Sequence, residues 1–276
     1  MKTLKTTLFL SFLTLWSCTT KTETSGDISE ERTSIEMVTD KGTIIIELYN
    51  ETPKHRDNFI KLANESAFDS LLFHRVIESF MIQGGDPDSR FAQPGDTLGN
   101  GDRPYKVDAE FHPDLFHKKG VLAAARDGNL ERASSSMQFY IVKGKVYTDS
   151  LLVVAEGRIN GWLADHYFKN DPANKPLVDS LQKAIDNKNR DQYTVINDSI
   201  RSLAKKYENF DKYAIPEPHR EVYKSIGGTP HLDQNYTVYG EVVKGLGIVD
   251  SIAAEETDKL DRPVMDVRIL SVRVVE

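Results

Sequence analysis

The strand-forming pattern of this chain stops at residue 144 and returns only after residue 227, and this interruption constrains the fold more than any other feature. Residues 33–143 and 228–276 contain short runs rich in β-branched and aromatic side chains, separated by turns with glycine. Residues 144–227 carry apolar side chains at helical spacing instead. Many short strands with glycine turns favour a closed barrel or a sandwich. We therefore expect a mainly β domain that is interrupted by an α-helical insertion.

The β domain is predicted to begin with a hairpin. Residues 35–39 and 43–48 are rich in β-branched side chains, and an Asp40-Lys41-Gly42 turn joins them. Thr52 can then cap a helix that has Pro53 at its first position. Further strands are expected at residues 120–125, 136–142, 236–242 and 267–275.

Three apolar patterns predict helices within the insertion, because each repeats at the spacing of one helix face. They comprise Leu151, Leu152, Ile159, Trp162 and Leu163; then Pro176, Leu177, Leu181, Ala184 and Ile185; and then Ile196, Ile200, Leu203, Ala204 and Tyr207. A short helix should follow Pro216 and Pro218 and end at Gly227-Gly228. The charged faces of these helices are most simply solvated surfaces. Capture of client proteins or of a partner protein by the insertion stays open as an alternative.

The N-terminus has the pattern of a targeting segment. Lys2 and Lys5 precede an apolar run over residues 8–16, which is too short to span a bilayer. The run ends just before Cys18, the only cysteine in the chain. This arrangement resembles a bacterial lipoprotein signal, in which the cysteine is lipidated and becomes the mature N-terminus. A plain secretory signal and a buried free thiol are the alternatives.

The lipoprotein resemblance implies a location. Residues 1–17 would be a signal peptide that is removed, and lipidation of Cys18 would anchor the protein to a membrane. Residues 18–32 are rich in Thr, Glu, Ser and Gly, and are expected to form a flexible tether. The folded part would then lie in the bacterial cell envelope, facing the periplasm.

The charge of the chain argues against nucleic acid as a partner. The formal net charge is −7 at pH 7, whereas phosphate binding needs clustered Lys and Arg. A hydrophobic share of 39% and a mean hydropathy of −0.44 are those of an ordinary soluble globular protein. Four of the histidines are scattered without metal-ligand spacing, and no cysteine lies near them, so we expect no metal site. They are His112, His117, His219 and His231.

Residues 73–86 bring a cation, an apolar surface and an amide together. Arg75 precedes Phe80 and Met81, Gln83 follows, and a Gly-Gly-Asp turn closes the segment. No activated nucleophile and no acid pair is evident in it, so this combination suits polarising a neutral group rather than cutting a bond. The alternative for Arg75 is a structural ion pair. His74 has the pattern of a packed, hydrogen-bonded core histidine rather than of a base.

Together with later motifs, this segment resembles the cyclophilin family of peptidyl-prolyl cis/trans isomerases. The motifs that carry the resemblance are Phe73-His74-Arg75, Phe80-Met81-Ile82-Gln83-Gly84-Gly85-Asp86, Ser135-Ser136-Met137-Gln138-Phe139-Tyr140-Ile141, and Leu232-Asp233 before Tyr236-Thr237-Val238-Tyr239-Gly240. They cover about residues 33–143 and 228–276. The resemblance implies a closed eight-stranded antiparallel barrel capped by two helices, with the active site in a groove on its outer face and no cofactor.

The resemblance also assigns roles by position. Arg75 would be the catalytic arginine, and Gln83 would act with it and bind the peptide backbone. The remaining substrate-binding residues would be Phe80, Met81, Tyr140 and Leu232 in a proline pocket, Gln138 on the backbone, Ala125 as an apolar wall and Tyr236 at the rim. The implied substrates are proline-containing polypeptides, here exported or envelope proteins.

The chemistry of the prolyl bond agrees with these roles. Amide resonance sets a rotation barrier of roughly 18–20 kcal/mol, so the bond isomerises slowly. A donor near the prolyl nitrogen stabilises its deconjugated form, which exists only in the transition state. Arg75 is charged at any physiological pH and can supply that donor. The alternative function is a chaperone module that binds proline segments with little turnover.

Three positions depart from the best-known cyclophilins. His231 stands where many eukaryotic members have a tryptophan that helps to bind cyclosporin, so we expect weak inhibition by that drug. Arg126 stands where an asparagine commonly supports the peptide backbone. Tyr140 replaces the usual phenylalanine, and its hydroxyl group needs water or a partner at the edge of the pocket.

Overall fold

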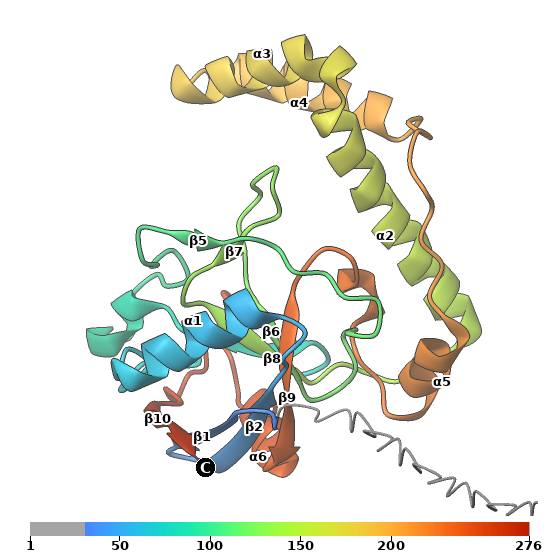
Figure 1. Ribbon diagram of the computed structural model, residues 1–276. Helices are drawn as coiled ribbons and strands as arrows, with labels where there is room; N and C mark the ends of the chain where they lie inside the picture. Colours follow the sequence, from blue (N-terminus) through green and yellow to red (C-terminus); the bar gives the residue numbers. More distant parts are fainter. Residues whose placement is uncertain (1–30, 276) are drawn as a thin grey trace, which may run out of the picture. The chain divides into compact units, whose positions relative to one another are not determined.

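Eight antiparallel strands form the sheet that organises this protein, in the order β10-β1-β2-β9-β6-β8-β4-β3 (Figure 1). The computed structural model describes residues 31–275, so Cys18 and the predicted signal peptide lie outside the described residues. The strands are β1 Ser34–Thr39, β2 Gly42–Leu48, β3 Arg75–Ile77, β4 Met81–Gly84, β6 Val121–Ala124, β8 Phe139–Val142, β9 Val238–Lys244 and β10 Ile269–Val275. The short strands β5 Lys106–Val107 and β7 Ser134–Ser135 pair separately.

The two edges of this sheet meet through the residues that precede β3 and β10. Leu72 and Arg268 form an antiparallel bridge, and the Ile269 amide donates to the Leu71 carbonyl at 2.8 Å. The Phe73 amide donates to the Val267 carbonyl at 2.9 Å. The predicted eight-stranded antiparallel fold is therefore confirmed as a curled sheet, whose edges join over a few residues rather than along a full ladder.

The interior of the curled sheet is an apolar core covered by two helices, α1 Pro53–Asn64 and α6 Leu246–Ala253. Phe59 and Leu62 of α1 are buried in this core, as are Val249 and Ile252 of α6. Burial of each such side chain stabilises the fold by about 1.5–3 kcal/mol. The predicted hairpin and the helix after Thr52 are both present.

The cap of α1 differs from the prediction. Thr52 occupies the N-cap position, but its side chain makes no capping hydrogen bond. The Glu110 carboxylate accepts from the Lys54 and His55 amides instead, at 3.1 and 3.0 Å. A carboxylate also interacts favourably with the positive end of a helix dipole. Glu110, which is distant in sequence, therefore caps α1 in place of the adjacent Thr52 that the sequence predicted.

Helices fill the chain between β8 and β9. They are α2 Asp149–Asn170, α3 Lys175–Asp186, α4 Arg190–Ala204 and α5 Glu217–Ser225, with the 3₁₀ turns η2 Pro172–Asn174 and η3 Pro230–Leu232; a further 3₁₀ turn, η1 Pro87–Phe91, follows β4. Within residues 31–275, no helix has both the length and the apolar content required to cross a bilayer.

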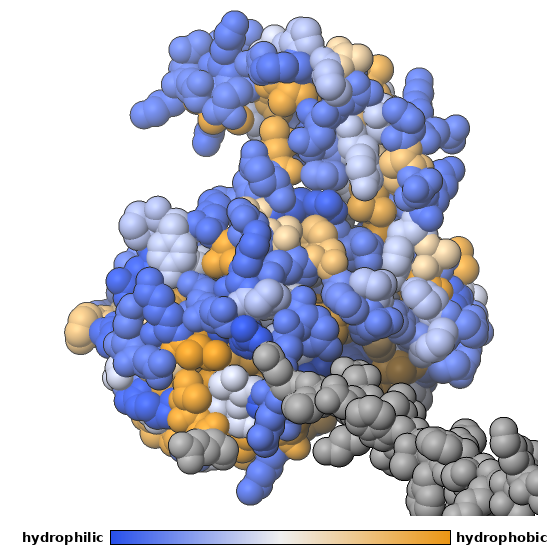
Figure 2. All heavy atoms as spheres, viewed as in Figure 1, coloured by the Kyte–Doolittle hydropathy of each residue, from blue (hydrophilic) through white to orange (hydrophobic). Residues whose placement is uncertain are grey.

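Two small cores hold these helices together. Leu152, Ile159 and Leu163 of α2 are buried together with Tyr223 of α5. A second core joins the C-terminal end of α2 to α4, α3 and the segment after α4; it comprises Phe168, Ile200, Ala204, Leu177, Leu181, Ile196 and Tyr207. Figure 2 shows hydrophilic side chains over much of the surface of these helices, with small hydrophobic patches between them.

Candidate active site

The register of the sheet places three of the predicted site residues in one row. Arg75 on β3 is paired with Gln83 on β4, and Gln83 is paired with Tyr140 on β8. Side chains at directly paired positions lie on the same face of a sheet. Arg75, Gln83 and Tyr140 are therefore cross-strand neighbours on the face opposite the buried Val76 and Ile82.

The Gly-Gly-Asp turn after β4 fixes the end of this row. Gly85 has a positive φ of 92°, and a Cβ atom at this position would lie 2.2 Å from the Met137 carbonyl oxygen. Only glycine suits both conditions. Asp86 is fully buried, and its carboxylate accepts from the amides of Asp88 and Gly99. The turn thus ties β4 to the 95–101 loop and packs closely against Met137, just before β8.

A pocket with a volume of about 150 Å³ opens beside the row. Its lining residues are Arg75, Phe80, Met81, Gln83, Ala125, Arg126, Tyr140, Leu232 and Tyr236. All of the predicted substrate-contacting positions line this pocket except Gln138. We call this cavity the proline pocket, after the ligand that the motifs predict.

Arg75 has a weak partner. Its Nε atom lies 3.5 Å from a carboxylate oxygen of Asp261, and both side chains are 43% exposed. Exposed ion pairs contribute about 0–1 kcal/mol. A structural ion pair therefore gives little reason for an arginine here, and the guanidinium keeps donors that can face the pocket.

Gln138 lies behind Gln83. Its Nε2 group donates to the carbonyls of Gly99 and Gly101 at 3.0 and 2.8 Å, which directs its Oε1 atom toward Gln83. Gln83 Nε2 donates to this oxygen at 3.1 Å. An amide nitrogen carries two protons, so Gln83 retains one donor and its own carbonyl oxygen. Gln138 thus orients Gln83, and the 95–101 loop supports both.

The loop before β8 is held by one carboxylate. Asp102 accepts hydrogen bonds from the Ser135 and Ser136 hydroxyl groups at 2.7 and 2.6 Å, and from the Met137 amide at 3.1 Å. These bonds give the serines of the Ser-Ser-Met-Gln motif a structural role, which is to fix the path of the chain into Gln138.

The Tyr140 hydroxyl has a partner that the sequence did not indicate. It lies 2.9 Å from His117 Nε2, while His117 Nδ1 lies 2.8 Å from Asp233. Asp233 also accepts from the Tyr223 hydroxyl of α5 at 2.7 Å. Burial raises the pKa of Tyr140 and of Tyr223 well above the usual tyrosine value, so both hydroxyl groups remain donors. A buried network therefore joins α5 to the wall of the proline pocket.

Helix α2 lies beside the proline pocket. Trp162 of α2 packs against His231 and Tyr236, with ring centroids 6.4 and 6.5 Å apart. His231 in turn stacks on Phe80 at 5.7 Å. Burial, helped by the nearby Arg158, lowers the pKa of His231 to about 4, so its ring is neutral at pH 7. The insertion thus contributes an aromatic side chain to the surroundings of the pocket.

The third departure, Arg126, and the core residue His74 also have a structural account. Arg126 lines the proline pocket and lies over the Tyr236 ring, 4.9 Å from its centroid. It donates to the Asn235 carbonyl and side chain at 2.8 and 2.6 Å, which fixes its guanidinium. His74 is 4% exposed, and burial lowers its pKa to about 4. The buried neutral ring confirms the predicted packing of His74, but the predicted hydrogen bonding is not found, because neither ring nitrogen has a hydrogen-bond partner among the described residues.

The part of the chain that the structure describes contains no group of three or more His, Cys, Asp or Glu side chains that could hold a metal ion. The histidines have other contacts. His117 lies in the buried network, His231 stacks on Phe80, and His219 stacks on Phe116 with ring centroids 3.7 Å apart.

The sequence matches one known protein family that agrees with the predicted site. Residues 34–166 and 218–274 match the family described as "Cyclophilin type peptidyl-prolyl cis-trans isomerase/CLD", which covers more than half of the chain. The protein belongs to the cyclophilin family. This confirms the family and the enzyme class that the motifs predicted. The cyclophilin match also extends beyond the range expected from the motifs, because it includes most of α2 and all of α5 except Glu217.

Two curated relatives of this cyclophilin come from bacteria of the genus Staphylococcus. It is 27% identical over 249 residues to a protein of Staphylococcus haemolyticus, and 27% identical over 252 residues to one of Staphylococcus aureus. The match to the Staphylococcus haemolyticus protein covers 90% of this chain and 94% of the relative. The match to the Staphylococcus aureus protein covers 91% of this chain and 95% of the relative. Both relatives bear the name "Putative peptidyl-prolyl cis-trans isomerase".

Solved structures show the same fold. A cyclophilin type peptidyl-prolyl cis-trans isomerase of Cryptosporidium parvum superposes with a TM-score of 0.52 at 16% identity, over 89% of this chain and 99% of that one. A second structure of that protein, obtained in the presence of the dipeptide Ala-Pro, has a TM-score of 0.50 at 16% identity and covers 88% and 99%. The curled antiparallel sheet is thus the cyclophilin fold.

Proposed function

We propose that this protein accelerates the cis/trans isomerisation of X-Pro bonds in exported or envelope polypeptides, with Arg75 as the catalytic donor. The observation that carries the proposal is the row Arg75–Gln83–Tyr140 beside an apolar pocket. It combines a weakly paired cation, an oriented amide and an apolar wall. The structure of the Cryptosporidium parvum relative in the presence of Ala-Pro supports a prolyl ligand for this fold.

Arg75 would act on the prolyl nitrogen. As the bond twists, the nitrogen loses conjugation and becomes a hydrogen-bond acceptor, which it is not in the planar amide. A guanidinium N–H then stabilises the twisted form only, and this lowers the barrier. The 3.5 Å contact with Asp261 is long enough to yield to such a bond at little cost.

The other residues would hold the substrate. Phe80, Met81 and Leu232 would grip the proline ring through apolar contact. Gln83 would donate its second amide proton to a backbone carbonyl of the peptide, since Gln138 engages the first. Gln138 is then a positioning residue rather than a direct contact, which refines the role that the resemblance assigned to it.

The experiment is an exchange measurement on a short Ala-Pro-containing peptide, in which NMR reports the cis/trans exchange rate with catalytic amounts of the protein. We expect exchange to accelerate in proportion to protein concentration. Binding of the peptide without faster exchange at any concentration would reject the catalytic function.

We further propose that Cys18 carries a lipid that anchors the protein in the bacterial envelope, with the folded part facing the periplasm. Support comes from the sequence pattern before Cys18. Radioactive palmitate fed to expressing bacteria should label the wild-type protein but not a Cys18→Ser variant, and only the wild type should fractionate with membranes. Equal labelling of both would reject the anchor.

A chaperone module with little turnover is the second candidate, because apolar side chains remain exposed on the α3–α4 pair. Ile185, Val195 and Leu203 are 47%, 67% and 49% exposed. Replacing residues 172–204 with a short linker leaves α2 and α5 in place. If this variant isomerises peptides normally but no longer suppresses client aggregation, the helices bind clients and the sheet performs catalysis. Loss of neither property would remove support for this candidate.

A further inference from the structure

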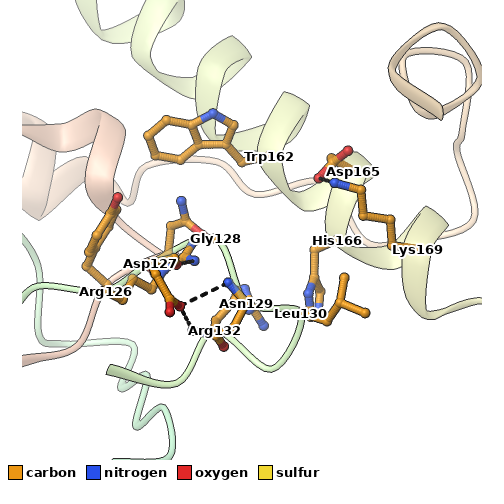
Figure 3. Close-up of a pocket in the computed structure, with 12 residues that line it drawn as sticks. Arg126, Asp127, Gly128, Asn129, Leu130, Arg132, Trp162, Asp165, His166 and Lys169 are labelled. Atoms are coloured by element: carbon orange, nitrogen blue, oxygen red, sulfur yellow. Dashed lines mark hydrogen bonds and ion pairs between the residues drawn. The ribbon is translucent and has the colours of Figure 1, made fainter. Parts of the chain in front are cut away.

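A second pocket adjoins the proline pocket, between α2 and the loop at residues 126–132 (Figure 3). Its volume is about 360 Å³, and it shares Arg126 and Tyr236 with the proline pocket. The lining residues are Arg126, Asp127, Gly128, Asn129, Leu130, Arg132, Trp162, Asp165, His166, Lys169, Asn235 and Tyr236. We call it the flanking pocket. A chain bound in the proline pocket can therefore continue into it.

One wall is a single face of α2. Trp162, Asp165, His166 and Lys169 follow the spacing of one helix face and line the flanking pocket. His166 lies beside Leu130 of the loop, whereas Asp165 and Lys169 pair with each other along α2 (Figure 3). Because Trp162 also packs on His231 and Tyr236, this wall is fixed against the proline pocket.

The opposite wall is held by its own hydrogen bonds. Asn129 accepts from the Ala133 amide at 2.8 Å and donates to the Ala133 carbonyl at 2.7 Å. It also donates to Asp127 at 2.6 Å. Arg132 donates to the Gln234 carbonyl at 2.7 Å, which joins the loop to the segment before β9. The flanking pocket is thus preformed.

The charges of the flanking pocket do not balance. Its two carboxylates are each paired with a lysine, Asp127 with Lys106 at 2.9 Å and Asp165 with Lys169 at 2.7 Å. Within residues 31–275, neither Arg126 nor Arg132 has a carboxylate at ion-pair distance.

Arg132 is the less satisfied of these two arginines. Its Nε atom is buried and finds no hydrogen-bond partner among the described residues. Burial lowers the pKa of His166, and the nearby Arg132 lowers it further, which indicates a positive potential in the pocket. This potential is local, since the chain as a whole carries a net charge of −7.

We propose that the flanking pocket binds an acidic side chain of the substrate polypeptide, close in sequence to the isomerised proline. This rests on the proposed function, because it uses continuity with the proline pocket. A carboxylate in the flanking pocket would compensate the charge of Arg126 and Arg132, through the charge-assisted hydrogen bonds that arginine favours. The Trp162 and Tyr236 rings offer apolar contact to the stem of a glutamate. The insertion would thereby give this isomerase a sequence preference.

The test uses the full chain and a set of fluorescent peptides with one central Ala-Pro. A single Glu is placed in turn at each of three positions before and after this dipeptide, with Gln and Lys peptides as matched sets. Fluorescence anisotropy gives the Kd, and NMR exchange gives the isomerisation rate. We expect Glu at one or two positions to bind about three- to tenfold more tightly than Gln, and Lys more weakly than Gln. The preference should shrink at high salt, as expected for partly exposed charges.

Arg132→Gln should bring the Glu-to-Gln affinity ratio close to one, whereas Arg132→Lys should keep part of it. Arg201→Gln removes the same charge from α4, outside the pocket, and should leave the ratio unchanged. Circular dichroism checks that each variant folds, and the wild-type ratio stands as a test without any variant.

Equal affinity of the wild type for Glu, Gln and Lys peptides at every position would overturn the proposal that the flanking pocket binds an acidic side chain. Retention of the full preference in Arg132→Gln would overturn it as well. Preferential binding of Glu peptides without faster isomerisation would instead reject the proposed catalytic function and support acidic side-chain binding in the flanking pocket. The experiment therefore distinguishes failure of the catalytic proposal from failure of the binding proposal.

Discussion

His117 Nε2 lies 2.9 Å from the Tyr140 hydroxyl oxygen, and this hydrogen bond links the wall of the proline pocket to the buried Asp233. A carboxylate accepts hydrogen bonds, so His117 Nδ1 donates to Asp233, and Nε2 on the other side of the ring makes the hydrogen bond with the Tyr140 hydroxyl. Asp233 receives a further bond from Tyr223 of α5. The tyrosine that departs from the family pattern is therefore part of a network that also includes the insertion.

Replacing Tyr140 with Phe should lower stability more than activity. The ring that lines the pocket remains, but His117 Nε2 loses its partner in a buried site. We expect a loss of about 1–2 kcal/mol in the free energy of unfolding, measured by urea denaturation, and a change in kcat/KM of less than about threefold. A large loss of activity with unchanged stability would show that the hydroxyl acts on the substrate.

Replacing Tyr223 with Phe should destabilise the protein although Tyr223 lies outside the proline pocket. The variant removes one of the donors that satisfy the buried Asp233 carboxylate, and hydrogen bonds to charged groups are worth about 1.5–3 kcal/mol. Urea denaturation gives the loss. Tyr193→Phe on α4, whose ring is 39% exposed, serves as the control and should change little. Equal stabilities of the two variants would contradict the network.

Gln83 and Gln138 should behave as one unit. If Gln138 acts by orienting Gln83, Gln138→Ala should lower kcat/KM by about three- to tenfold, and should add little once Gln83 is already Ala. A double-mutant cycle on kcat/KM measures this coupling. Fully additive effects would indicate that Gln138 contacts the peptide independently, as the sequence alone suggested.

Acidification should destabilise the protein partly through His74. Its folded pKa of about 4 lies below the ordinary value of 6.5, so the unfolded chain binds a proton between these pH values and the folded chain does not. Stability therefore falls as pH drops from about 6.5 to 4. His74 should contribute on the order of 2–3 kcal/mol of this loss. Denaturation of wild type and His74→Gln at pH 7.5 and 4.5 should show a smaller loss in the variant; identical losses would refute this origin.

The sequence predicted most of the sheet and the proline pocket because both depend on short-range patterns. The motif at residues 80–86 contains the residues of β4 and the glycine that lets the turn approach Met137. The motif at residues 135–141 contains the residues that enter β8 beside it. Once β4 and β8 pair in this register, each motif residue has a fixed cross-strand neighbour, such as Tyr140 opposite Gln83.

The remaining features depend on contacts between segments that no spacing reveals. Trp162 has the spacing of a helix core residue, but it packs on His231 of η3 rather than on the core shared with Tyr223. Glu110 caps α1 from more than fifty positions away in sequence, so the local pattern pointed to Thr52. Gln138 matches a family position, yet only the structure shows that its hydrogen bonds are directed into the protein.

The most direct test of the central claim is the cis/trans exchange rate of a proline peptide with wild type, Arg75→Lys and Arg75→Ala. Removal of one transition-state donor typically costs about a hundredfold or more, and Asp261 is so weak a partner that folding should hardly change. We predict that Arg75→Ala loses at least about a hundredfold in kcat/KM, with unchanged circular dichroism and a Kd for the peptide within about threefold of the wild type. Arg75→Lys should be intermediate, because lysine keeps the charge without the fork. An Arg75→Ala variant that accelerates exchange as fast as the wild type would contradict the account.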